Sequence, residues 1–286
     1  MEKVITCSIC ASTNVRKFCV KRGYTIYRCM DCSLAFVWPI PQDAAVLYSE
    51  AYFQGKGNDH GYLNYDRDKE PMRKVFLHYL SVLGKATSGR RLFDVGAATG
   101  YFLDIARHTG WTTYGSDISP FAAREARARG HRMTGGNLRE AAESDFFDVV
   151  TMWDVLEHVP NPRATLAEVH RLLRIGGVVA INTVDMSSLW ARLLGRRWNM
   201  LIPPEHLFYF STANLSLLLT QTGFQVMEKR KIGKKFSLAY VCKTLYNWQK
   251  IPLWETLAGL VARKPFSRLT LPINVRDNVF VLAKKT

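Results

Sequence analysis

The chain has 286 residues, 48% of them hydrophobic, and carries a formal net charge of +15. A chain of this length and composition can bury a full core, which excludes a disordered or low-complexity protein and suits one catalytic domain with a small appendage. The positive charge predicts an anionic partner, whether a nucleic acid, a membrane surface or a phosphorylated substrate.

Two C-x-x-C pairs stand near the N-terminus. Cys7 and Cys10 form the first pair and Cys29 and Cys32 the second, with eighteen residues between the pairs. This spacing is typical of a four-thiolate zinc site, and four thiolates leave no open coordination position, so the expected zinc is structural. A disulfide pair or simply buried thiols are the alternatives, and the first residues do not read as a secretory segment. We expect a zinc ribbon over residues 1–40.

Residues 41–89 are expected to form a linker and N-terminal helices. An aromatic, polar segment that includes Tyr62 and Tyr65 comes first, and a helix follows at about Met72 to Leu83. The prolines just before this region end the ribbon.

A glycine-rich turn follows the linker. Residues 92–102 predict a strand that runs into this turn and then into a helix, and Gly96 and Gly100 let the backbone approach a ligand closely. Asp117, at the end of the next strand, can accept hydrogen bonds from both hydroxyls of a ribose. Asp94 at the entrance would repel a pyrophosphate but is compatible with the ammonium of S-adenosylmethionine. The pattern favours that cofactor over a dinucleotide; a purely structural turn is the alternative.

A regular alternation of strands and helices follows. Residues 146–153 and 178–183 read as buried strands, and the helical repeat over residues 166–173 ends at Gly176 and Gly177. Repeated strand–helix units predict an open parallel sheet with helices on both faces, whose ligands bind at the carboxyl ends of the strands. Asp154, like the two carboxylates near the glycine turn, falls at such an end.

From about residue 90 to 230 these ordered motifs resemble the class I S-adenosylmethionine-dependent methyltransferases. The resemblance implies an α/β, Rossmann-like sheet over residues 90–286, with a helical insertion near 236–264. It also implies cofactor contacts from the ends of the strands, the glycine turn and the aromatic linker, namely Asp94, Gly96, Ala97, Gly100, Tyr101, Phe102, Asp117, Ile118, Asn137, Leu138, Trp153, Asp154, His158, Tyr62 and Tyr65.

Two further segments carry candidate catalytic residues. Glu157 and His158 follow the fourth strand, and Glu205 and His206 lie in a proline-stiffened loop before the next helix. Methyl transfer to a hydroxyl or a carbon acid needs a base, and a histidine can titrate near neutral pH. We expect His206, His158 and Glu205 to be catalytic.

Each segment also has a structural alternative. His158 can be a structural histidine bonded to its neighbour or to the backbone. In the loop, Phe208, Tyr209 and Phe210 can belong to the core while His206 caps the helix that begins near Ser211.

Together with the cysteine module, the two Glu-His pairs resemble a bacterial group of zinc-ribbon methyltransferases associated with polysaccharide and sugar-nucleotide biosynthesis. This resemblance implies a cytoplasmic enzyme that methylates a hydroxyl or carbon of a sugar, nucleotide sugar or lipid-linked glycan. An RNA methyltransferase, in which ribbon and positive charge hold the phosphate backbone, is the alternative from another class. A non-catalytic binding module is a third, and the intact cofactor motif argues against it.

An apolar, aromatic segment over residues 236–261 bears on membrane contact. Lys243, Lys250 and Pro252 interrupt it, so it is not expected to span a bilayer. It can lie on the inner face of a membrane as a peripheral element, or pack on the core as an ordinary helical insertion. The sequence does not predict the oligomeric state.

Overall fold

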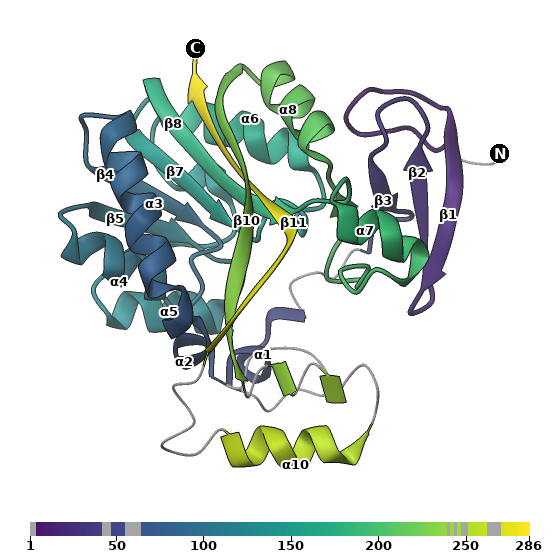
Figure 1. Cartoon of the computed structure of the whole chain (residues 1–286). Coiled ribbons are helices and arrows are strands. Elements are labelled where there is room, and N and C mark those ends of the chain that lie inside the picture. Colours follow the sequence, from purple (N-terminus) through teal and green to yellow (C-terminus); the bar gives the residue numbers. More distant parts are fainter. Residues whose placement is uncertain are drawn as a thin grey trace.

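The structure is a computed structural model that describes residues 4–41, 47–54, 64–238, 241–242, 245–246, 251–261 and 270–286. Tyr62 and much of the aromatic segment around it lie outside these residues. The described chain forms two sheets, a larger one of seven strands and a smaller one of four (Figure 1).

The larger sheet has the strand order β10-β11-β8-β7-β4-β5-β6. The five strands from β4 to β8 run parallel, whereas β11 is antiparallel to both β8 and β10. The strands are β4 (Arg91–Val95), β5 (Thr112–Ser116), β6 (Arg132–Thr134), β7 (Phe147–Trp153), β8 (Leu173–Val184), β10 (Phe224–Ser237) and β11 (Thr270–Lys285). The expected Rossmann-like α/β sheet is confirmed, with an antiparallel pair added at one edge.

Helices cover both faces of this sheet (Figure 1). Apolar side chains of α3 and α4 pack with sheet residues into one buried cluster, and those of α6 and α8 pack into a second. The four helices are α3 (Arg73–Ala86), α4 (Tyr101–His108), α6 (Pro162–Leu172) and α8 (Thr212–Gln221). β7 is buried along almost its whole length, which explains why its sequence is mostly apolar, apart from Asp148 and Thr151, and does not alternate.

The boundary between α6 and β8 differs from the sequence-based expectation. The helix ends at Leu172 and the strand begins at Leu173, so Gly176 and Gly177 lie inside β8 rather than ending the helix. Gly176 has φ +76°, and a Cβ on Gly177 would lie 2.9 Å from the carbonyl oxygen of Arg174. The glycines therefore permit an irregular start to the strand, where its pairing with β7 also shifts register.

The smaller sheet contains the cysteine ribbon. Its order is β1-β2-β3-β9, where β1 (Val15–Lys21), β2 (Tyr24–Cys29) and β3 (Ala35–Val37) come from the N-terminus and β9 (Phe208–Tyr209) from the catalytic domain. Because the last strand comes from about 170 residues further along the chain, the ribbon does not end at residue 40 as a self-contained unit. The segment after His206 completes its sheet.

Side-chain hydrogen bonds also fix the ribbon to the helices. Arg163 of α6 donates from Nη2 to the carbonyl oxygen of Ile9 at 2.6 Å. Asn214 of α8 donates from Nδ2 to the carbonyl oxygen of Cys32 at 3.2 Å. Buried ribbon residues belong to the same apolar cluster as α6 and α8, so the ribbon packs against one side of the catalytic domain.

Shorter elements connect these parts. They are α1 (Glu50–Gln54), α2 (Tyr65–Lys69), η2 (Glu70–Met72), α5 (Pro120–Ala128), η3 (Leu138–Glu140), α7 (Leu189–Leu194), η4 (Gly195–Arg197) and α10 (Pro252–Val261). Of the helical insertion expected near residues 236–264, the structure describes α10 and short pieces before it. No helix in the described ranges has both the length and the apolar run needed to cross a lipid bilayer.

Candidate functional site

The glycine turn at the carboxyl end of β4 needs its glycines for two reasons. Gly96 has φ +69° and Gly100 has φ +87°, values that residues with a side chain rarely adopt. A Cβ on Gly96 would lie 2.6 Å from Cγ2 of Val155, and one on Gly100 would lie 2.9 Å from Cδ2 of His131. The turn therefore lies tightly against the segment that follows β7, where the candidate catalytic residues begin.

Asp117 at the end of β5 holds the turn from the other side. Its Oδ2 accepts a hydrogen bond from the backbone N–H of Ala98 at 2.8 Å, and its Oδ1 accepts one from Ser119 at 2.8 Å. Burial raises the pKa of this carboxyl, and these two hydrogen bonds oppose the rise. Each oxygen retains a second lone pair, which a ribose hydroxyl can use. Ile118 beside it is 48% exposed and offers apolar surface to a planar base.

Asp94 lies at the entrance to the turn and is buried. Thr151 of β7 donates a hydrogen bond from its hydroxyl to Asp94 Oδ1 at 2.6 Å. Burial raises the pKa of Asp94 to about 8, the hydrogen bond from Thr151 lowers it, and the neighbouring charge of Asp117 raises it further. A cation placed beside Asp94 would favour its carboxylate form, so the residue suits the ammonium of S-adenosylmethionine.

Asp154 is at the end of β7 in the left-handed conformation, with φ 56°. Its Oδ1 accepts a hydrogen bond from Asn182 Nδ2 at 2.7 Å, and its own N–H donates to the carbonyl oxygen of Asn182 at 2.9 Å. The carboxyl ends of β4, β5 and β7 therefore present the three carboxylates at one edge of the sheet, as the sequence predicts.

Several residues expected to contact the cofactor have structural partners. Phe102 and Trp153 pack against Phe76 of α3, with ring centroids 5.1 and 5.7 Å apart. Leu138 is buried, and Asn137 Oδ1 accepts a hydrogen bond from the N–H of Arg139, which caps η3. These contacts place Phe102 and Trp153 in the core beneath α3.

Two tyrosines from the same expected group lie near α2. Tyr101 donates a hydrogen bond from its hydroxyl to Glu70. Tyr65 packs its ring against Phe53, with centroids 5.7 Å apart, in a small cluster that also contains Ala98 of the glycine turn. Tyr65 is therefore the expected linker aromatic that the structure places beside the turn.

The two predicted catalytic segments meet at His158 and His206. Their ring centroids are 4.8 Å apart at an interplanar angle of 76°. Nδ1–H of His158 donates to the carbonyl oxygen of Glu205 at 2.7 Å, and Nδ1–H of His206 donates to that of Met200 at 3.0 Å. Because a carbonyl oxygen can only accept, these bonds assign a proton to each Nδ1. In the neutral form of each ring the lone pair is then on Nε2, which is the tautomer of a base that acts through Nε2.

Glu157 ties the loop to the sheet. Its side chain is fully buried and its Oε2 accepts a hydrogen bond from the hydroxyl of Thr183 at 2.7 Å. Its carbonyl oxygen accepts from the N–H groups of Leu207 and Phe208 at 2.8 and 3.1 Å. Glu157, His158 and His206 present possible ligand atoms within 4.8 Å of one another. Glu157 therefore connects the segment after β7 to the loop that carries His206.

Glu205 contributes through its backbone rather than its carboxylate. The side chain forms an ion pair with Arg22 of the ribbon at 3.5 Å, whereas the carbonyl oxygen accepts from His158. These two contacts position the loop and the histidine. The predicted place of Glu205 beside His206 in the acceptor site stays a prediction.

The structural alternative for the aromatic run is partly right. Phe208, Tyr209 and Phe210 are buried in the core, as that alternative expects. The helix, however, is capped by Ser211, whose Oγ accepts a hydrogen bond from the N–H of Asn214 at 3.2 Å. His206 is therefore not the helix cap.

Tyr48 is a site residue that sequence reasoning missed. Its hydroxyl oxygen lies 3.0 Å from His158 Nδ1, and its ring packs beside Tyr52 in the small cluster that includes Ala98. Burial raises the pKa of the Tyr48 hydroxyl, and the charges of Glu205, Glu157 and Asp117 raise it further. The tyrosine thus links the glycine turn to the histidine pair, although no motif around it signals this role.

The four ribbon cysteines converge as the C-x-x-C spacing predicts. Sγ of Cys7 lies 3.5 Å from Sγ of Cys32, and Sγ of Cys10 lies 3.5 Å from that of Cys29. All four sulfurs lie within 4.8 Å of one another, and none is in a disulfide. Tetrahedral Zn–S bonds of about 2.3 Å require sulfurs about 3.8 Å apart, so the cluster fits a zinc ion.

A family model described as a methyltransferase domain matches residues 65–229, which is more than half of the chain. The chain belongs to this methyltransferase family. The matched residues contain the glycine turn, Asp117 and both histidines, and the protein is an S-adenosylmethionine-dependent methyltransferase.

Curated relatives of this methyltransferase include three proteins named ubiquinone biosynthesis O-methyltransferase. The protein of Thiobacillus denitrificans is 26% identical over 155 residues, which cover 49% of this chain and 67% of the relative. That of Alkalilimnicola ehrlichii is 30% identical over 148 residues, covering 48% and 59%. That of Hahella chejuensis is 28% identical over 197 residues, covering 60% and 81%. The chain thus spans about three fifths to two thirds of the length of the first two.

Solved structures share the fold at low sequence identity. The YcgJ protein of Bacillus subtilis has a TM-score of 0.52 and 16% identity, and the match covers 74% of this chain and 98% of that one. A chain in the complex between the Haloferax volcanii Trm112 methyltransferase activator and a candidate methyltransferase has a TM-score of 0.53 and 19% identity, covering 76% and 90%. These similarities support the methyltransferase fold.

Proposed function

We propose that this methyltransferase acts on a hydroxyl or acidic carbon of a small-molecule acceptor, and that this acceptor is a sugar, a nucleotide sugar or a lipid-linked glycan. The observation that carries the proposal is the pairing of His158 and His206, whose rings lie 4.8 Å apart. Two neutral imidazoles with their protons held on Nδ1 suit removal of a proton from an O–H or C–H group. The ribbon and the Glu-His pairs, which resemble the sugar-modifying group, support a sugar.

Different residues of the chain would bind the cofactor, remove the acceptor's proton and position the loop. S-adenosylmethionine supplies an electrophilic methyl group, and Asp117, Ile118 and the glycine turn suit its ribose, base and amino-acid end. In this proposal His206 Nε2 accepts the acceptor's proton, because His206 belongs to the loop that meets the segment after β7 at His158. His158, held between the Glu205 carbonyl and Tyr48, positions that loop against the turn. Methyl transfer is an in-line displacement, so such positioning supplies much of the rate.

A phenolic hydroxyl of a quinone precursor is the second candidate acceptor. It is favoured by the names of the curated relatives, which are ubiquinone biosynthesis O-methyltransferases. The same histidine base would serve a phenol, which is more acidic than a sugar hydroxyl. The proton-transfer step would therefore be the same for both candidate acceptors. They would differ in the residues that bind the rest of the acceptor molecule.

The ribbon zinc in this proposal is structural. Four sulfurs within 4.8 Å of one another would fill the coordination sphere of a zinc ion. The ion would hold together the knuckles that carry β3, the strand that pairs with β9. The metal would therefore affect the reaction only indirectly, by fixing the position of the loop that carries His206.

The deciding experiment measures formation of S-adenosylhomocysteine from S-adenosylmethionine with separate panels of nucleotide sugars, dihydroxyphenols and total RNA. Calorimetry with S-adenosylmethionine on the same sample first establishes that the cofactor binds. Turnover with a nucleotide sugar supports the proposal, and turnover with phenols alone transfers the assignment to quinone precursors. Methylation of RNA that falls steeply with added salt would overturn the small-molecule assignment.

A further inference from the structure

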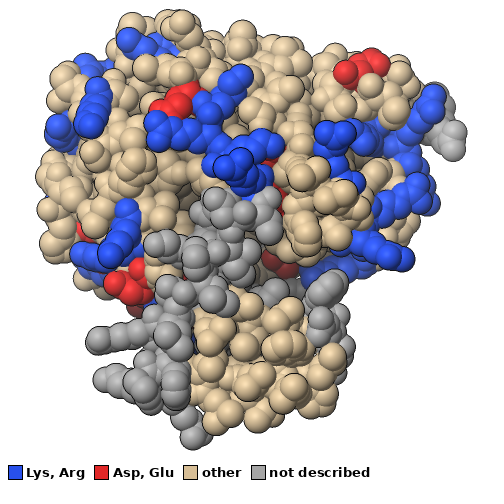
Figure 2. Space-filling view, viewed as in Figure 1, with Lys and Arg blue, Asp and Glu red and all other residues tan. Residues whose placement is uncertain are grey.

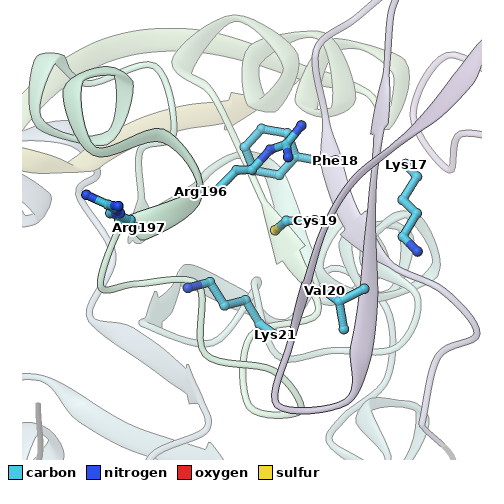
Figure 3. Close-up of a pocket in the computed structure, with 7 residues that line it drawn as sticks. All are labelled: Lys17, Phe18, Cys19, Val20, Lys21, Arg196 and Arg197. Carbon is cyan, nitrogen blue, oxygen red and sulfur yellow. The ribbon is translucent and has the colours of Figure 1, made fainter.

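A cavity of about 570 Å³ lies between strand β1 of the ribbon and the η4 turn of the catalytic domain. Figure 3 shows it from the side, with the ribbon strand on one wall and the segment after α7 on the other. It does not involve the carboxylates at the ends of β4, β5 and β7. Its lining residues are Lys17, Phe18, Cys19, Val20, Lys21, Arg196 and Arg197.

The charge of the lining is entirely positive. Four of the seven residues are lysine or arginine, and none is acidic. Lys21 comes from the ribbon strand and Arg196 and Arg197 from the segment across the hollow, whereas Lys17 points away on the far side of the strand (Figure 3). In the described part of the chain Lys21, Arg196 and Arg197 form no ion pair, although Arg22 next to them does. Among the described residues, these three cations therefore have no carboxylate partner in an ion pair.

Two of these positive charges, Lys21 and Arg196, also act on the buried Cys19 in the cavity lining. Cys19 is buried there, and its sulfur points toward the space between Lys21 and Arg196 (Figure 3). Burial raises the pKa of the Cys19 thiol, while the charges of Lys21 and Arg196 oppose that rise. An anion seated at this depth would be stabilised by the same charges. Figure 2 shows that Lys and Arg side chains also gather on the outer face of the ribbon around this region.

The cavity adjoins the loop that carries His206. Lys21 is followed by Arg22, which forms the ion pair with Glu205 at 3.5 Å. On the other wall Arg197 is followed by Trp198, in the segment that leads to Met200 and the loop. Tyr209, whose ring centroid lies 6.4 Å from that of Trp198, donates its hydroxyl proton to the carbonyl oxygen of His206 at 3.0 Å. The pKa of Tyr209 is raised by burial and responds to Cys19 as well as to Glu205, which puts the cavity floor within electrostatic reach of the loop.

We propose that this cavity binds a phosphate or diphosphate group, and that this group is the anionic end of the acceptor. The identification with the acceptor rests on the proposed function, whereas the anion site itself does not. Guanidinium groups match phosphate oxygens in pairs, and a diphosphate can meet Arg196, Arg197 and Lys21 together. The adjoining sugar would then extend toward His206. A nucleoside diphosphate and a prenyl diphosphate share this chemistry.

The first test is calorimetry of the full chain with inorganic pyrophosphate. We expect binding, and a loss of at least about tenfold in affinity in the Arg196→Ala/Arg197→Ala double variant, because the variant removes two charge-assisted contacts to the anion. Lys21→Ala tests the opposite wall independently. The matched control is Lys74→Ala/Lys85→Ala, which removes two exposed charges from α3. Affinity for S-adenosylmethionine should be the same in all variants, which also shows that they are folded.

The outcomes separate the anion site from the proposed function. The cavity assignment would be overturned, whatever the acceptor is, if pyrophosphate did not bind. It would also be overturned if the α3 control lost as much affinity for pyrophosphate as the Arg196→Ala/Arg197→Ala variant. Specific pyrophosphate binding with no turnover on any sugar would leave the site standing and count against the proposed function. Competition experiments then identify the source of the diphosphate. Displacement of pyrophosphate by UDP indicates a nucleoside diphosphate. Displacement by phosphatidylcholine vesicles that contain a polyprenyl diphosphate, and not by vesicles without it, indicates a lipid-linked one.

Discussion

Ala35 of the ribbon is paired with Tyr209 of the catalytic domain, three residues after His206. The neighbouring pair, Phe36 with Phe208, completes this short antiparallel contact. Because both N–H groups that lead into β9 also bond to the carbonyl oxygen of Glu157, the loop is held from two directions. The ribbon therefore sets the position of the histidine relative to the sheet edge where the cofactor motif lies.

Loss of the ribbon metal should reduce turnover without reducing cofactor affinity. Metal analysis of the purified protein should give one zinc per chain, and Cys29→Ser should lose it. A loop displaced by about 1 Å can cost on the order of 10²-fold in rate, so we expect a fall of that size. Cys242→Ser, a buried cysteine outside the cluster, is the matched control. A folded, fully active Cys29→Ser protein without zinc would disprove this role.

Substitution of His206 should affect turnover far more than binding. We expect His206→Ala to lower kcat by about 10²–10⁴-fold, the range for loss of a general base, while S-adenosylmethionine affinity is retained. Stopped-time assays and calorimetry on one preparation measure the two effects. His78→Ala, an exposed histidine on α3, serves as the control. Normal turnover in His206→Ala would show that the proton is taken elsewhere.

Substitution of Asp117 should weaken cofactor binding. Asp117→Asn keeps the shape of the side chain but removes its charge, and we expect S-adenosylmethionine affinity to fall by at least about tenfold, which is about 1.4 kcal/mol. Asp117→Ala should in addition lower stability by about 1–3 kcal/mol, because the N–H groups of Ala98 and Ser119 lose their acceptor. Calorimetry and thermal melts check the two effects. Glu143→Gln, at an exposed carboxylate, should change neither. Unchanged affinity in Asp117→Asn would exclude the ribose contact.

Asp94 should make the stability of the protein depend on pH. Its pKa is about 8 in the fold against an ordinary value of 3.8, so the folded state retains a proton that the unfolded state has released. The free energy of unfolding should therefore fall as pH rises between these values, by up to about 1.4 kcal/mol per pH unit, and level off above them. Asp94→Asn should flatten this slope, and exposed Glu143→Gln should not. Denaturant melts from pH 5 to 9 measure how the free energy of unfolding changes with pH. The same slope in Asp94→Asn as in the unmodified protein would contradict the raised pKa of Asp94.

The catalytic sheet could be predicted from the sequence because its signals are local. Buried parallel strands such as β7 are mostly apolar along their whole length. Asp94, Asp117 and Asp154 lie at the ends of strands that are neighbours in the sheet. The α6–β8 boundary could not be predicted, because glycines end helices and also permit irregular strands. There the pairing with β7, which is a tertiary contact, decides between the two.

The candidate site could be predicted only in part. The sequence singles out both histidine segments because each carries its own motif, and the structure adds that the two rings lie 4.8 Å apart. The role of Tyr48 and the direction of the Glu205 side chain depend on contacts between distant segments, with His158 and with Arg22. The two-residue strand β9 is too short to have a periodicity of its own. Such features become visible only once the chain has folded.

The shared sheet also bears on how this protein can change during evolution. A ribbon that ended at its own last strand could be lost, gained or exchanged between relatives as a separate cassette. Here the edge of β3 is covered by residues 208–209, so a foreign ribbon would have to match both the register and the side chains of that segment. We therefore expect substitutions in residues 35–37 and 207–210 to be correlated among homologues, and natural recombination to preserve the two segments as a pair.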